Sequence, residues 1–426
     1  MTNALNSRRL SQSFWVDPPA SQAPPPTPDS EDWLRSWQTV FARDIIDSRV
    51  VSVDAETAVE DACDILLSED TFCLAITSSG AYTGLFDFSD VNAFLTLAAT
   101  RHTLQPEYLR QHSQVDSIVS AARAGHVPVR LVSNLSEKNP LKTLPNDANI
   151  VSLLEIFAEG AHRVLIKAPA PSNDFIGLVS DRRLLDWFSS YARDAPALQE
   201  YLSNSLSSLA LPSLNIYTSV VATTSNSTVL DAMKLMSEGG VSSVAVTDEE
   251  SGKLLSAVSV TDIGKIVVPS QSNQILSTPL HQFIAQIKAP DGSKDGVDKY
   301  PVYSVTPASP LTYTVQKLLA TNAHRLFVTR ESSGNASPSL TAANSGNLTG
   351  IVSVVDVLYL FARIANIPNL DPTRMQRHRR ASSASSHSSL SEHELLRSRS
   401  NSRTSVRRSP VIPTSPGAGV SALELN

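Results

Sequence analysis

The sequence has few cysteines and no long apolar runs. Cys63 and Cys73 are the only two cysteines in 426 residues, and their spacing matches neither a disulfide framework nor a zinc-ligand pattern. Both are expected to be small buried residues of a protein kept in a reducing compartment. No apolar run approaches 18 residues, and the N-terminus shows no apolar signal-peptide segment. We therefore expect a protein that is neither secreted nor membrane-spanning.

The motifs of common catalytic centres are missing as well. The chain contains no Gly-x-Ser-x-Gly elbow, no Walker loop and no HExxH helix, and its nine histidines are scattered. Each of these patterns places reactive groups at a fixed spacing, so their absence removes the usual sequence support for catalysis or a metal centre. The expectation is a non-enzymatic protein that requires no cofactor.

Charge is spread unevenly along the chain. Residues 371–426 carry nine arginines against four acidic residues, whereas the rest carries 26 basic and 37 acidic residues. An acidic body argues against direct nucleic-acid binding. The basic tail is Ser/Arg-rich and is expected to be disordered, as an interaction or phosphorylation segment or simply as solubilising chain.

The N-terminal part contains two different segments. Residues 1–30 hold six prolines and almost no apolar periodicity, which predicts a disordered arm. Residues 31–46 place Trp33, Trp37 and Phe41 at helical spacing, which predicts an amphipathic helix. That helix either packs on the body of the protein, which we favour, or docks a partner.

A four-fold repeat occupies most of the remaining chain. Each unit has the order strand, helix, apolar strand, turn, apolar strand and helix. The strands are short, β-branched and bounded by Gly, Ser and Asn turns, whereas the helices carry apolar residues at three- and four-residue spacing. A partly helical connector is expected at 101–140, and a polar surface loop at 331–347 within the last unit. The units, called repeats 1 to 4 below, cover residues 47–100, 141–195, 214–270 and 300–366.

These β-α-β-β-α units resemble cystathionine-β-synthase (CBS) repeats. The resemblance covers roughly residues 45–366 and depends on four recurrences of one pattern. One unit alone leaves an apolar sheet face uncovered, so CBS repeats pair two at a time. The resemblance therefore implies an α/β (α+β) fold with two Bateman-type domains between disordered termini.

The last strand of every repeat ends in a recurrent motif. The four versions are GLFDFSD, GLVSDRR, SAVSVTD and GIVSVVD, and three of them end in an acidic residue, namely Asp90, Asp262 and Asp356. A carboxylate at the first turn of a helix can accept hydrogen bonds from both ribose hydroxyls of a nucleotide. Ser-x-x-Asp is equally a helix-capping pattern, and both interpretations remain open at this point.

Repeats 2 and 4 share a His-Arg pair before their apolar strands. The pairs are His162/Arg163 and His324/Arg325, and Arg183 replaces the acidic residue of the motif in repeat 2. The γ regulatory subunit of AMP-activated protein kinase is similar in both features. That resemblance implies convergence on the phosphates of AMP, ADP or ATP, with Val355 as a departure from the pattern. The phosphate-binding candidates are His162, Arg163, Arg182, His324, Arg325 and Ser353.

The alternative for each His-Arg pair is purely structural. A histidine at a strand edge can be capped by backbone groups while its arginine extends to solvent. Two pairs at one repeat position favour the phosphate interpretation over this one. In the tail, RRAS and RRSP present Ser382 and Ser409 to basophilic and proline-directed kinases, respectively.

The attachments to the repeats point to one group of CBS proteins. The proline-rich arm, the Trp-bearing helix and the RHRRASSASSHSS tail resemble a fungal family of free-standing four-CBS proteins. That resemblance implies regulation or inhibition of type-2A-like protein phosphatases in nutrient and stress signalling. It also implies roles in cell separation and DNA replication, in cytoplasm and nucleus. The alternative is a γ-type subunit of an AMP-activated or sucrose-nonfermenting protein kinase.

Overall fold

The computed structural model describes ten segments of the chain. They are residues 28–101, 113–172, 174–209, 211, 214, 220–268, 274–288, 303–329, 348–368 and 370. The chain divides into two units, 1–380 and 381–426, and every described residue lies in the first. Most of the N-terminal arm, the loop at 331–347 and the tail with Ser382 and Ser409 lie outside the described residues.

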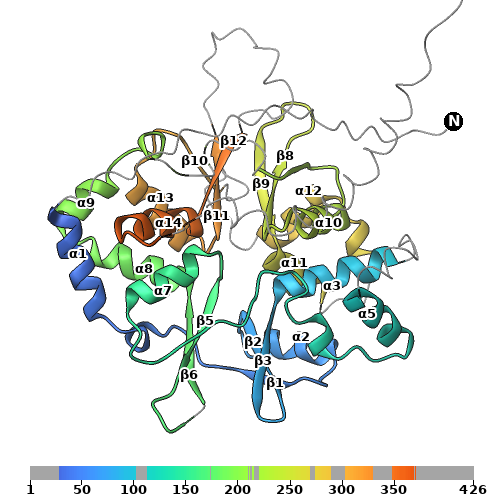
Figure 1. The fold of residues 1–426 in the computed structure, drawn as a ribbon. Helices are drawn as coiled ribbons and strands as arrows, with labels where there is room; N and C mark the ends of the chain where they lie inside the picture. Colours follow the sequence, from blue (N-terminus) through green and yellow to red (C-terminus); the bar gives the residue numbers. More distant parts are fainter. Residues whose placement is uncertain are drawn as a thin grey trace, which may run out of the picture. The chain divides into compact units, whose positions relative to one another are not determined.

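Repeats 1 and 2 have the element order that the sequence predicts (Figure 1). Short runs of consecutive apolar residues form the strands, and a three- or four-residue apolar spacing forms the helices. Repeat 1 consists of β1 (Ser52–Asp54), α2 (Val59–Ser68), β2 (Cys73–Ser78), β3 (Ala81–Asp87) and α3 (Phe88–Thr100). Repeat 2 consists of β4 (Thr143–Leu144), α7 (Ile150–Ala158), β5 (Arg163–Lys167), β6 (Phe175–Ser180) and α8 (Asp181–Tyr191).

Repeats 3 and 4 are built in the same way. Repeat 3 consists of β7 (Ala222–Thr224), α10 (Val229–Gly239), β8 (Ser243–Thr247), β9 (Leu254–Ser259) and α11 (Val260–Val267). Repeat 4 consists of β10 (Ser304–Val305), α13 (Leu311–Ala320), β11 (Arg325–Thr329), β12 (Leu348–Ser353) and α14 (Val354–Ile364). In every repeat the first strand runs parallel to the second across a helical crossover, and the second pairs antiparallel with the third.

Further helices lie outside the repeats. The expected connector contains α5 (Ser113–Arg123) and α6 (Val129–Val132). Two helices were not expected from the sequence, namely α9 (Pro196–Leu202) after repeat 2 and α12 (Leu280–Lys288) after repeat 3. Short 3₁₀ turns occur at Ala42–Ile45, Leu206–Ser208 and Ile275–Ser277.

The sheets pack in the pairs expected of CBS repeats. Ala75 and Leu85 of repeat 1 share an apolar cluster with Leu165 and Leu178 of repeat 2. Repeats 3 and 4 form the matching cluster, which includes Ala245, Ala257, Phe327, Leu348 and Ile351. Each sheet thus covers the apolar face that its partner would leave open to water.

The helices pack in a different combination from the sheets. Buried residues of repeats 2 and 4 share one large core, in which Phe188 of α8 stacks on Phe361 of α14 with ring centroids 4.0 Å apart. Repeats 1 and 3 share the other core. There α3 approaches α11 so closely that a Cβ on Gly264 would lie 2.2 Å from the Phe88 ring. Every repeat therefore contacts one neighbour through its sheet and another through its helices.

The N-terminal helix α1 (Pro28–Thr39) packs on the core of repeats 2 and 4. Trp37 is fully buried and lies edge-on to Phe188, with ring centroids 4.9 Å apart. Burial of a whole indole removes a large apolar area from water, which favours docking of the helix on the body. The expectation that this helix packs on the protein is met at Trp37, while Trp33 is half-buried.

Cys63 and Cys73 are buried free cysteines, as expected. Among the described residues, no helix combines the length and apolar character needed to cross a membrane.

Candidate functional site

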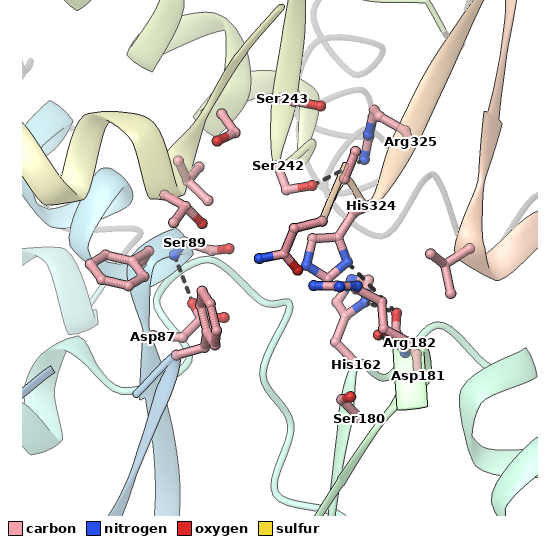
Figure 2. A pocket seen from close by; sticks show the side chains of 18 of the residues that line it. Asp87, Ser89, His162, Ser180, Asp181, Arg182, Ser242, Ser243, His324 and Arg325 are labelled. Carbon is pink, nitrogen blue, oxygen red and sulfur yellow. Dashed lines mark hydrogen bonds and ion pairs between the residues drawn. The ribbon is translucent and has the colours of Figure 1, made fainter. Parts of the chain in front are cut away.

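A cavity of about 1050 Å³ lies where the four repeats meet. Its wall includes Asp87 of repeat 1, Arg182 of repeat 2, Asp262 of repeat 3 and Arg325 of repeat 4. We call it the four-repeat cavity. Figure 2 shows side chains from several elements pointing into this space, with His162, His324 and Arg182 grouped together. All four repeats thus contribute side chains to one space.

The turn from the last strand into the last helix is built alike in each repeat. The strand's final residue is the N-cap, and its side chain accepts a hydrogen bond from a backbone N–H of the first helical turn. It also lies in register opposite the first residue of the middle strand. The four pairs are Asp87 with Cys73, Ser180 with Arg163, Ser259 with Ser243, and Ser353 with Arg325.

Asp262 and Asp356 both line the cavity and both belong to capping boxes. Asp262 accepts hydrogen bonds from the Ser259 backbone N–H at 2.9 Å and from Ser259 Oγ at 2.8 Å. Asp356 accepts a hydrogen bond from the Ser353 backbone N–H at 2.8 Å. The capping interpretation therefore holds at both positions, and Ser353 acts as the N-cap of α14. Their position on the cavity wall keeps the ribose role as a prediction.

Asp90 differs from its two counterparts. It is fully buried, is not among the lining residues, and accepts hydrogen bonds from Ser136 Oγ at 2.7 Å and Asn139 Nδ2 at 3.0 Å. Both donors lie in the connector that follows repeat 1. Burial and the nearby Asp87 raise the pKa of Asp90 to about 7, against the hydrogen bonds that lower it. Asp90 therefore holds the connector, and we do not propose it as a ribose ligand.

Arg183 stands where the other repeats have the acidic residue. Its Nη1 lies 2.6 Å from Asp186 Oδ2, one helical turn away. A guanidinium group cannot accept a hydrogen bond from a hydroxyl group, so repeat 2 cannot bind a ribose at this position in the way an acidic residue could.

Arg163 already forms an ion pair within the protein. Its Nη1 lies 2.9 Å from Asp87 Oδ2, and the two side chains are 15% and 10% exposed. The pair joins repeat 2 to repeat 1 beside the cavity. The predicted phosphate contact of Arg163 would compete with this carboxylate, so Arg163 is the weaker candidate of the two strand arginines.

Arg325 occupies the equivalent position in repeat 4 but has a different neighbour. The residue corresponding to Asp87 is Ser259, which carries no charge. Arg325 Nη2 donates to Ser242 Oγ at 3.4 Å, and its Nε has no hydrogen-bond partner among the described residues. Burial lowers the pKa of Arg325 to about 10, opposed by Asp356, so the side chain is cationic at neutral pH.

Arg182 is a second cation on the wall of the cavity. It follows the N-terminal residue of α8, and its Nε is buried without a hydrogen-bond partner among the described residues. Burial lowers the pKa of Arg182, while Asp181 and Asp47 raise it. A buried guanidinium nitrogen without a partner is costly, which makes Arg182 and Arg325 the strongest anion-binding candidates.

The two histidines lie together, as the resemblance implied. The rings of His162 and His324 are 5.6 Å apart between centroids. His162 Nδ1 lies 2.7 Å from Asp181 Oδ2, and His324 Nδ1 lies 4.0 Å from the same oxygen. Burial lowers the pKa of His324 to about 4. His324 is therefore neutral at pH 7 and contributes no positive charge to a phosphate.

Asp181 was not among the site residues expected from the sequence. This residue begins α8 and is fully buried, and its Oδ1 accepts a hydrogen bond from the Arg182 backbone N–H at 2.7 Å. Burial raises the pKa of Asp181, but the hydrogen bond with His162 and the charges of His162, His324 and Arg163 together outweigh burial, and the pKa is lowered. The sequence did contain a signal for Asp181, because the other repeats have the apolar residues Phe88, Val260 and Val354 at the equivalent position.

Comparison with known proteins identifies the repeat type. A family model described as CBS domain matches residues 216–268. Protein MJ1225 from Methanocaldococcus jannaschii, which has been put forward as an archaeal homologue of g-AMPK, superposes with a TM-score of 0.52. The match covers 76% of this chain and all of that chain at 16% identity. At this identity the likeness establishes the fold.

Fungal proteins named Sds23 match over most of the chain. The protein from Aspergillus niger is 30% identical over 329 residues, which are 75% of this chain and 63% of that protein. Those from Phaeosphaeria nodorum and Yarrowia lipolytica are each 32% identical, covering 75% and 72% of this chain. They are covered over 60% and 62% of their own length. The chain thus spans less than two thirds of these curated relatives.

Proposed function

We propose that this chain, which contains CBS repeats and is similar to the fungal Sds23 proteins, is a regulatory protein whose four-repeat cavity binds an adenine nucleotide. AMP, ADP and ATP are the candidate ligands. The supporting observation is that Arg182 and Arg325, both on the cavity wall, each have a buried Nε without a partner among the described residues. Phosphate oxygens satisfy such donors with charge-assisted hydrogen bonds.

The ion pair of Arg163 favours one part of the cavity over another. In repeats 1 and 2 the carboxylate of Asp87 already occupies the strand arginine. In repeats 3 and 4 the corresponding Ser259 leaves Arg325 without that counter-charge. The phosphates are therefore placed near Arg325 and Arg182, with the N-termini of α11 and α14 adding backbone donors and positive potential.

The acidic capping residues supply the ribose contacts in this proposal. Asp262 and Asp356 lie at the start of α11 and α14 and line the same cavity as Arg325. A carboxylate oxygen can accept more than one hydrogen bond, so a capping role is compatible with contact to a ribose hydroxyl. The nucleotide then bridges repeats 3 and 4, with its phosphates also reaching Arg182 of repeat 2, and the protein acts by binding, without catalysis.

The protein regulated in this way follows from the family resemblance. We propose that the chain regulates type-2A-like protein phosphatase catalytic subunits in nutrient and stress signalling. Cell separation and DNA replication are the processes served, in cytoplasm and nucleus. Phosphorylation of Ser382 and Ser409 by a protein kinase is proposed as a second level of control. The chain has no direct nucleic-acid or membrane role in this proposal.

Calorimetric titration of the full chain tests the nucleotide proposal. AMP, ADP and ATP are titrated into the wild type, His324→Ala/Arg325→Ala and Arg130→Ala. Arg130 is the matched control because it pairs with Glu56 at the surface, away from the cavity. We expect the double variant to bind at least about tenfold more weakly, from loss of a charge-assisted hydrogen bond. Tight binding unchanged by that substitution would refute the phosphate site.

A pull-down from a fungal lysate tests the partner. The tagged full chain should recover type-2A-like phosphatase catalytic subunits. Recovery of the α and β subunits of an AMP-activated-type kinase instead would overturn the phosphatase role and support the γ-subunit alternative. To measure whether the capture depends on nucleotide, the pull-down is repeated with added nucleotide and with adenosine, which lacks phosphate and is the negative control.

A further inference from the structure

Asp181 is a charged residue at a repeat position that is apolar in the other three repeats. Phe88, Val260 and Val354 begin α3, α11 and α14, whereas Asp181 begins α8. Its side chain is 1% exposed. A buried carboxylate is costly unless it is paired or binds a metal, so this replacement requires a partner that the other repeats do not need.

Two histidines from different repeats face this carboxylate. His162 precedes β5 of repeat 2, and His324 precedes β11 of repeat 4. One ligand atom from each of His162, Asp181 and His324 lies within 4.8 Å of the other two. The arrangement depends on the tertiary packing of repeats 2 and 4, because the histidines are 162 residues apart in the sequence.

The hydrogen bonding of the cluster is incomplete. His162 Nδ1 is within hydrogen-bond distance of Asp181 Oδ2, at 2.7 Å. His324 Nδ1 lies 4.0 Å from the same oxygen and is buried without a hydrogen-bond partner among the described residues. Figure 2 shows both rings directed toward Asp181. The pair interaction of His162 with Asp181 therefore does not account for the position of His324.

We propose that one ring nitrogen of His162, one ring nitrogen of His324 and a carboxylate oxygen of Asp181 bind a divalent transition-metal ion, with zinc as the primary candidate. Two imidazoles and one carboxylate form a known zinc ligand set that leaves one coordination position open. All three residues line the four-repeat cavity, so the open position faces that space. We call these residues the two-histidine cluster.

The distances suit a metal after small side-chain movements. Zinc binds imidazole nitrogen and carboxylate oxygen at about 2.0–2.2 Å, so neighbouring tetrahedral ligand atoms lie roughly 3.3–3.5 Å apart. The distances of 2.7 Å from His162 Nδ1 and 4.0 Å from His324 Nδ1 to Asp181 Oδ2 lie on either side of that value. The two distances to Asp181 Oδ2 would each have to change by about 0.6–0.7 Å to reach zinc spacing. The ligand nitrogens of the two histidines lie within 4.8 Å of each other, so their separation would have to shorten by at most about 1.4 Å.

The charges around the cluster set a limit on its affinity. Arg163 is paired with Asp87 and is largely neutralised. Arg182 lies next to Asp181 on the cavity wall and opposes a cation at short range. A water or anionic group on the open position of the metal could accept a hydrogen bond from Arg182. The site is therefore expected to bind more weakly than a closed structural zinc site, and to favour an anionic fourth ligand.

Metal titration of nucleotide-free full chain tests this proposal. The chain is first treated with a chelator and dialysed, and Co²⁺ alone is then added while visible absorption is recorded. Zn²⁺ alone is titrated by calorimetry. We expect one equivalent of Zn²⁺ to bind, and one equivalent of Co²⁺ to give the d–d bands of a tetrahedral ion that Zn²⁺ displaces.

Variants assign the site to these residues. His324→Ala and His162→Gln should each lower the affinity at least about tenfold, since loss of even an outer-shell partner costs 10–100-fold. His281→Ala and His126→Ala are the matched controls, since both histidines contact backbone oxygens outside the cavity. Asp181→Asn is a further ligand variant, to be scored only if circular dichroism shows it to be folded.

Two kinds of result would overturn the metal proposal. Absence of the cobalt bands in wild type, or equal affinity in folded His324→Ala and wild type, would overturn the proposal. Loss of binding in His281→Ala or His126→Ala alone would assign the metal elsewhere and would overturn it as well. Because nucleotide is absent throughout, failure of the metal site leaves the nucleotide proposal untouched. Nucleotide titrations are run in the presence of chelator, so failure of nucleotide binding there leaves the metal proposal untouched.

Discussion

Asp87 of repeat 1 and Arg163 of repeat 2 form a nearly buried ion pair, with 2.9 Å between Asp87 Oδ2 and Arg163 Nη1. Asp87 also caps α3, since its side chain accepts a hydrogen bond from the Ser89 backbone N–H at 2.7 Å. One carboxylate thus fixes a helix start and neutralises a cation from the next repeat. The pair explains why the two strand arginines, alike in sequence, differ in their surroundings.

Removal of Asp87 should destabilise the protein strongly. Asp87→Ala leaves Arg163 buried without its counter-charge, and the expected loss in unfolding free energy is about 3–5 kcal/mol. Denaturant unfolding measures it. The control is the exposed Arg130–Glu56 pair, whose side chains are 49% and 64% exposed. Glu56→Ala should cost about 1 kcal/mol or less, and equal losses for the two substitutions would contradict this reading.

Trp37 provides a second test, now of the N-terminal helix. Trp37 is fully buried against Phe188 and Phe361. Trp37→Ala should therefore lower the unfolding free energy by about 3–5 kcal/mol. Trp33→Ala should cost less because Trp33 is half-buried. An unchanged unfolding midpoint for Trp37→Ala would show that α1 contributes little to the body of the protein.

A third prediction separates capping from ligand binding at Asp356. Asp231 forms the same capping box at the start of α10, is exposed and lies outside the cavity lining. Asp356→Ala and Asp231→Ala should each lose about 0.5–2 kcal/mol of stability through the damaged cap. Calorimetry with AMP should show weaker binding for Asp356→Ala alone. Equal AMP affinity in both variants would leave Asp356 with a capping role and no ligand.

The fourth prediction concerns pH and Asp90. Burial and Asp87 raise the pKa of Asp90 from 3.8 to about 7. Because the folded protein holds this proton more tightly than the unfolded chain, its stabilising contribution is complete below about pH 4. It is lost as the pH rises through about 7. The wild type should therefore lose stability relative to Asp90→Asn across this range. A difference in unfolding free energy that is independent of pH would contradict the assignment.

The repeated fold could be predicted because its signals are local. In repeat 4, for example, β11 and β12 are short runs of β-branched and apolar residues, whereas α13 and α14 carry apolar residues at three- and four-residue spacing. These periods depend on neighbouring residues alone. The expected α/β fold of four CBS repeats, paired through their sheets, is confirmed. The sharing of helix cores between repeats 1 and 3 and between 2 and 4 required the structure.

The candidate site was predictable only in part, for a related reason. The recurrence of the His-Arg pair singled out His162 and His324, which do lie together. Asp181 escaped notice because its importance comes from a contact with His324, far away in the sequence. Asp90 seemed equivalent to Asp262 because its donors, Ser136 and Asn139, lie in a connector with no repeat pattern.

Hydrogen–deuterium exchange with and without AMP tests the central claim, that the four-repeat cavity binds the nucleotide, most directly. The prediction is slower exchange in peptides around Arg182, Arg325 and the starts of α11 and α14, with little change in α1 and α5. Protection at these cavity segments should disappear in His324→Ala/Arg325→Ala. Unchanged exchange at the cavity under AMP concentrations that saturate binding, or protection confined to segments elsewhere, would contradict the account.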